Sequence, residues 1–77
     1  GGIAMILRML NVHGESNAEV ARLGCGALKN LAVNADNKSK ILAANGVSMV
    51  ERMKSTWASN ADVQTEADDA LGRLNFN

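Results

Sequence analysis

Apolar residues recur every three or four positions along most of this chain, which is the spacing of one face of an α-helix. In the longest run they extend from Val20 to Ala32, and Asn17 stands just before it, in the position of an N-terminal cap. The pattern predicts an all-α fold with five helices. These helices cover residues 2–10, 17–33, 36–44, 47–55 and 61–74.

Short polar segments separate the predicted helices. Residues 11–16 are expected to form a loop, and either Asn34 or Asp36 can cap the short third helix. Asn45 and Gly46 are expected to end that helix, because both residues tolerate the left-handed backbone that a helix terminus often needs.

The expected core consists of the apolar stripes of these helices. Leu28 and Leu71 occupy matching positions in the two long helices, so we expect both to be buried. Gly24 is small enough to let a neighbouring helix approach closely. Trp57 is expected to cover one end of the core. The stripe of the second helix is made of Val20, Leu23, Gly24, Ala27, Leu28, Leu31 and Ala32, and the expected fillers between helices are Met5, Met9, Met49 and Met53.

The chain also nearly repeats itself. The apolar pattern of residues 2–10 returns 44 positions later in residues 46–54, and that of residues 17–31 returns 43 positions later in residues 60–74. A period of this size is typical of stacked helical repeats of about 40–47 residues. Such repeats bury their apolar faces against one another and present a long surface to partners.

The repeated residues resemble the armadillo repeat. The similarity lies in the Gly-Gly-Ile opening of residues 1–3, in Ala-Leu-Lys-Asn-Leu-Ala at residues 27–32, and in Asn-Gly-Val at residues 45–47. Residues 1–33 would be the second and third helices of one repeat, and residues 34–77 a complete following repeat. The related HEAT repeat fits less well, because its two-helix unit has no place for the short third helix. The resemblance implies a fragment of a right-handed α-α superhelix.

The armadillo resemblance also implies a function. The third helices of the family line a concave groove that binds an extended peptide of a partner protein, with an asparagine holding the peptide main chain. Asn30 occupies that place here, and an amide can both donate to and accept from a peptide unit. A local hydrogen bond within the stack is the alternative for Asn30. The implied groove residues are Arg22, Gly26, Asn30, Thr65, Asp69 and Arg73.

Two departures from the family pattern narrow the expected ligand. The importin-alpha class has a tryptophan where this chain has Gly26, and the second repeat has Arg73 in place of the asparagine. A receptor for nuclear localisation signals is therefore not expected. Arg22 and Arg73 favour an acidic or phosphorylated peptide, unless they are only solvated surface charges.

A structural role is the alternative function. Three apolar positions of the first repeat are charged in the second, as a terminal repeat requires: Leu7 becomes Glu51, Leu10 becomes Lys54 and Leu23 becomes Glu66. We therefore interpret the chain as the C-terminal end of a longer array. In this interpretation it packs against other repeats, or forms a homo-oligomer through its N-terminal apolar face (Ile3, Met5, Ile6 and Leu7).

Composition limits the remaining classes of function. The formal net charge is zero, which argues against binding to nucleic acid or to a membrane surface. Cys25 is the only cysteine, so an intrachain disulfide is impossible, and a cytoplasmic or nuclear location is expected. Cys25 and His13 make neither a nucleophile pair nor a metal site, and Asp68 and Asp69 diverge around a helix. We expect no enzyme, no cofactor and no metal.

Overall fold

The computed structural model describes residues 2–75 of the 77-residue chain. Within that range it contains five helices and no strand, which confirms the all-α prediction. In chain order they are α1 (Gly2–His13), α2 (Ala18–Leu31), α3 (Ala35–Ala43), α4 (Gly46–Thr56) and α5 (Ala61–Asn75).

Asparagine side chains begin three of these helices. Asn17 Oδ1 accepts hydrogen bonds from the backbone N–H groups of Glu19 and Val20, at 3.0 and 3.3 Å. Asn34, rather than Asp36, caps α3 in the same way. Asn60 Oδ1 accepts from the N–H of Val63 at the start of α5. Each cap satisfies N–H groups that have no partner inside the helix.

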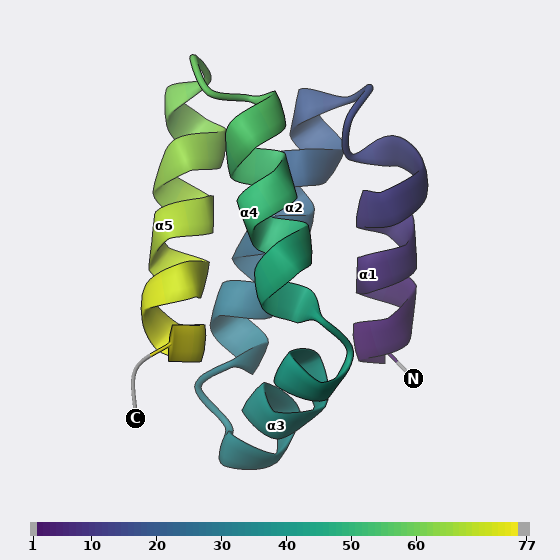
Figure 1. Cartoon of the computed structure of the whole chain (residues 1–77), viewed down its shortest axis with the longest axis vertical. Coiled ribbons are helices and arrows are strands. Elements are labelled where there is room, and N and C mark those ends of the chain that lie inside the picture. The colour runs from purple at the N-terminus through teal and green to yellow at the C-terminus, as the bar shows by residue number, and fades with distance from the viewer. Residues whose placement is uncertain (1, 76–77) are drawn as a thin grey trace.

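The helices form two hairpins that stack side by side. α1 and α2 make the first hairpin, α4 and α5 the second, and the short α3 closes one end between them (Figure 1). α2 and α5 run in the same direction and form the most extensive helix contact of the fold. The prediction that these two long helices stack roughly parallel is therefore confirmed.

A single core fills the space between the hairpins. Its fully buried side chains come from all five helices and include Leu10, Leu28, Ile41, Val50, Met53 and Val63. Leu28 is completely buried, as predicted, whereas Leu71 is only partly buried at the edge of the core. Gly24 is buried against Leu10. The two residues are so close that a Cβ at position 24 would lie 2.7 Å from Leu10 Cγ. The predicted close approach at Gly24 is confirmed.

Several boundary predictions were wrong. α1 continues through residues 11–13, which we expected to be a loop, and ends where the N–H of Gly14 donates to Leu10 O. Only Asn45 adopts the left-handed backbone, with φ of 63°. Gly46 is instead the first residue of α4, and a Cβ at this position would lie 2.9 Å from Ile41 O, so a larger residue would have to shift its neighbours.

Other corrections concern burial. Leu23 and Met5, which we expected to be buried, are 53% and 73% exposed, because no helix in the described part of the chain covers the outer sides of α1 and α2. Of the N-terminal apolar face, Leu7 is buried, while Ile3 and Ile6 are partly buried against the core. Met5 is therefore the residue of this predicted face that remains exposed.

Candidate peptide-binding groove

The candidate groove follows the seam between α2 and α5. Arg22, Gly26 and Asn30 lie four residues apart along α2, and Thr65, Asp69 and Arg73 repeat this spacing on α5. Residues four apart on a helix share one face. Because α2 and α5 lie side by side, their two faces can form one surface.

An ion pair ties the two helices together at the centre of this seam. Lys29 Nζ donates to both carboxylate oxygens of Glu66, at 2.8 and 3.0 Å, and both side chains are largely buried. Gly26 makes room for the pair, since a Cβ there would lie 3.0 Å from Glu66 Oε2. A larger residue at position 26, such as the tryptophan of the importin-alpha class, would displace the carboxylate.

Three of the six predicted groove residues come together around this pair. Arg22, Gly26 and Asn30 line a shallow pocket of about 360 Å³, together with Lys29 and Glu66. Asn30 is exposed, and its carboxamide forms no hydrogen bond with any residue in the 2–75 range. Its donor and acceptor groups are therefore both free to bind a peptide unit.

Arg22 connects this pocket with a smaller one. The second hollow, of about 230 Å³, is lined by Arg22, Asp62, Thr65 and Glu66. The Arg22 guanidinium also forms an ion pair with Glu19, one turn earlier on α2, with an N–O distance of 2.9 Å. An incoming acidic group would compete with Glu19 for this arginine.

Of the remaining predicted residues, Thr65 lines the smaller pocket, while Asp69 and Arg73 line neither of the two. Asp69 is exposed, and Thr65 Oγ1 donates to the carbonyl of Ala61 within its own helix. Arg73 Nη1 donates to the carbonyl of Lys29 at 3.1 Å. This carbonyl is in the last turn of α2, where carbonyls lack a partner inside the helix. Arg73 therefore caps the end of the neighbouring helix and is not simply a free surface charge.

Sequence reasoning missed the two residues at the centre of the site. Glu66 was interpreted as part of a polar outer face, because it stands 43 positions after Leu23. It faces inward instead, toward Lys29. The available signal was the pair of opposite charges on two helices that were expected to stack, together with the small residue at position 26.

The other candidate chemistry does not form a reactive site. Cys25 is fully buried in the core, and its burial, aided by the nearby Glu66, raises the pKa of the thiol to about 11. Lys29 and Lys54 hold Glu66 and Asp68 separately, so these acids do not converge. Within residues 2–75, no three His, Cys, Asp or Glu side chains are grouped as metal ligands. In the same range, no helix is both long enough and apolar enough to cross a membrane.

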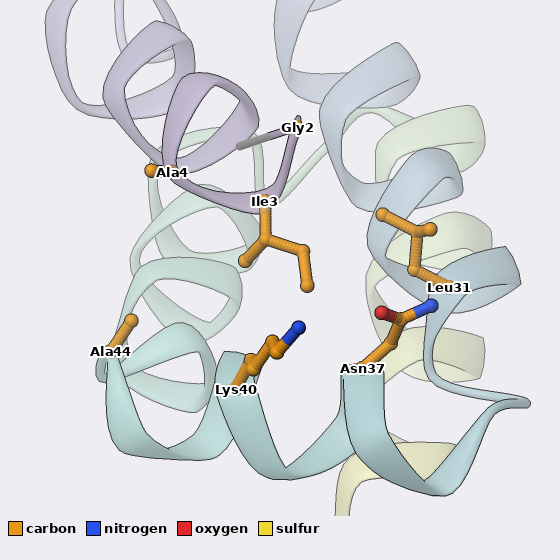
Figure 2. A pocket seen from close by; sticks show the side chains of 7 residues that line it. All are labelled: Gly2, Ile3, Ala4, Leu31, Asn37, Lys40 and Ala44. Atoms are coloured by element: carbon orange, nitrogen blue, oxygen red, sulfur yellow. The ribbon is translucent and has the colours of Figure 1, made fainter.

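A larger hollow of about 510 Å³ opens between α1 and α3. Figure 2 shows Ile3 of α1 facing the same space as Asn37 and Lys40 of α3. The residues that line this hollow are mainly apolar. Its two polar side chains are Asn37, which is partly buried, and Lys40, which is exposed. It lacks the convergent buried polar groups that fix a small ligand in place.

Comparison with known proteins adds no relative. No family model, no curated protein and no solved structure matches this chain. The armadillo resemblance therefore rests on the sequence motifs alone.

Proposed function

We propose that this chain is a non-enzymatic interaction module whose α2–α5 seam binds an extended peptide of a partner protein. The observation that carries the proposal is the pocket lined by Arg22, Gly26 and Asn30, in which the amide of Asn30 has no partner within residues 2–75. In this proposal the fold is an armadillo-type superhelix, with α2 and α5 as third helices. A peptide lying along them would exchange main-chain hydrogen bonds with Asn30.

The charges around the seam favour an acidic or phosphorylated peptide. Arg22 is more than one third exposed, and its present partner, Glu19, is exposed and local, so an exchange of partners would cost little. Lys29 is already neutralised by Glu66. Arg22 is therefore the cation on α2 that is most available to a ligand, while Arg73 is held by the end of α2.

Peptide binding tests this function. The probes are fluorescein-labelled extended peptides that differ only in carrying glutamate, phosphoserine or lysine, and the measurement is fluorescence anisotropy. Asn30→Ala should weaken binding of the acidic peptides by about 1–3 kcal/mol, because a peptide group loses its partner. Arg22→Glu should reverse the preference for acidic side chains.

The matched control is Arg8→Glu, which makes the same charge change beside a separate hollow on α1. It should leave peptide binding unchanged. If a peptide retains full affinity after both Asn30→Ala and Arg22→Glu, it binds another surface and the groove proposal fails.

A second candidate function is packing against further helical repeats or against a copy of the chain. The observation that favours it is the exposure of Met5, Val12 and Leu23, at 73%, 60% and 53%. Met5 and Val12 line the same open hollow on α1, and exposed apolar patches often mark an interface. Sedimentation over a range of concentrations would detect self-association, and a strictly monomeric chain would leave only packing against other repeats.

A further inference from the structure

The outer face of α1 carries an apolar stripe that no other helix of residues 2–75 covers. Met5, Met9 and Val12 follow one another on the side of α1 that points away from the core, and together with Arg8 and His13 they line an open hollow of about 440 Å³. α1 contains no acidic residue, so Arg8 has no local ion-pair partner on its own helix. We call Met5, Arg8, Met9 and Val12 the α1 outer face.

The chain contains a second version of this face that is covered. Met49, Arg52 and Met53 of α4 stand 44 positions after Met5, Arg8 and Met9, and all three residue types are identical. Met53 is completely buried, in contrast to the half-open Met9. What covers the α4 version therefore indicates what fits the α1 outer face.

Arg52 recognises the end of a helix and the acid that follows it. Its Nη2 donates to the carbonyl of Asn11 at 3.3 Å and to Asn11 Oδ1 at 3.0 Å, in the last turn of α1. Its Nε lies 3.5 Å from Glu15 Oε1, in the turn that follows. A guanidinium suits this position, because it can bind a carbonyl and a carboxylate at the same time.

A glycine completes this recognition. Gly14 is buried under the sulfur of Met53, and a Cβ at position 14 would collide with that Sδ atom. Thr56 Oγ1 adds a hydrogen bond to Glu15 Oε2 at 3.3 Å. Arg52, Met53 and Thr56 of α4 thus bind the end of a helix that is followed by a glycine and then directly by an acidic residue.

We propose that the α1 outer face docks another helical hairpin whose first helix ends in a glycine–acid turn, with Arg8 on the helix end and Met9 over the glycine. This proposal deepens the packing role proposed above and rests on it. A second copy of this chain is not the occupant, because its own Gly14–Glu15 turn is covered by α4. Its other interhelix turn on that side, residues 57–60, contains neither glycine nor acid.

A lengthened chain tests the proposal. A second copy of residues 1–45 is fused to the N-terminus of residues 2–77. The added copy thus places a further Gly14–Glu15 turn before the original α1. Arg8→Ala in the original unit should then lower the urea midpoint of the lengthened chain about as much as Arg52→Ala lowers that of the 77-residue chain. In the 77-residue chain itself, Arg8→Ala should leave the midpoint unchanged.

Two controls separate the outcomes. Glu15→Gln in the added unit alone should remove part of the effect of Arg8→Ala, which a double-mutant cycle measures. Hydrogen exchange of the original α1 reports whether it has been covered at all. If α1 becomes protected but Arg8→Ala does not change the urea midpoint, the added hairpin packs on α1 and recognition by Arg8 is refuted. If α1 remains unprotected, including the case where the added unit does not fold, both are refuted.

Discussion

At the residue scale, stability depends on a few completely buried side chains. Leu28 of α2 is one of the largest of them and belongs to the core between the hairpins. Replacing a buried leucine with alanine removes apolar contacts and leaves a cavity. Arg22 lies on the same helix but at the surface, where an exposed ion pair contributes little.

Leu28→Ala should therefore destabilise the chain by about 2–5 kcal/mol, a large part of the stability of so small a domain. Arg22→Ala should change stability by less than about 1 kcal/mol. Urea unfolding followed by circular dichroism measures both. Equal losses for the two variants would show that the two faces of α2 have been assigned incorrectly.

The buried thiol of Cys25 should make stability depend on pH. Its pKa is raised from the ordinary 9.0 to about 11 in the folded chain, so the unfolded chain releases this proton first as pH rises. The contribution of the thiol is complete below pH 9 and is lost as pH rises toward 11. Cys25→Ala, which lacks the group, should show a smaller fall in unfolding free energy across that window.

Titration of lysines acts in the same pH range, so the informative quantity is the difference between the two proteins. Alkylation gives an independent measurement, because the thiolate is the reactive form. Iodoacetamide at pH 8 should modify the native protein far more slowly than the urea-unfolded protein. Similar rates would mean that Cys25 is not buried in solution.

At the element scale, the two helical glycines Gly46 and Gly72 differ in how much room a Cβ atom would have. Gly46 begins α4 against the backbone of Ile41, whereas Gly72 lies in α5, where no atom of residues 2–75 outside its own turn lies within 4 Å of the place of its missing Cβ. A methyl group at position 46 must move backbone, while one at position 72 meets no neighbour among the described residues. Glycine inside a helix is also less favourable than alanine.

Gly46→Ala is thus expected to destabilise the fold by about 1–3 kcal/mol through overpacking. Gly72→Ala, the matched control, is expected to stabilise it by about 0.5–1 kcal/mol. Thermal unfolding of both variants checks the pair. A stabilising Gly46→Ala would mean that α3 and α4 are packed more loosely than the structure indicates.

The elements were largely predictable from the sequence, but their contacts were not. Apolar periodicity and the caps Asn17 and Asn34 define where helices lie, because these signals are local. The end of α1 was missed, since residues 11–13 carry no strong helical or loop signal and Gly14 serves a contact with Met53 instead.

The candidate site shows the same division. The spacing of Arg22, Gly26 and Asn30 was enough to place them on one face, and they line one pocket. The Lys29–Glu66 pair was missed because it joins residues 37 positions apart, and local periodicity contains no information about such partners. The same holds for Arg73, whose partner is a backbone carbonyl of α2.

At the scale of the whole molecule, the question is whether the two hairpins unfold together. One core joins them, and the α2–α5 contact is larger than the contact inside either hairpin. A hairpin on its own would expose that core to water, so neither should persist without the other. We expect a single cooperative transition.

Trp57 makes this expectation measurable, because it is the only tryptophan and it spans the two hairpins. It follows α4, and its indole Nε1 donates to the carbonyl of Gly14 at 2.7 Å in the first hairpin. Its fluorescence therefore reports on docking of the hairpins, while circular dichroism reports on helix content. In urea the two signals should change with the same midpoint, as a two-state transition requires. Fluorescence that changes at a lower urea concentration than helicity would show that the hairpins separate before they melt, and the 77 residues would then behave as two units in contact.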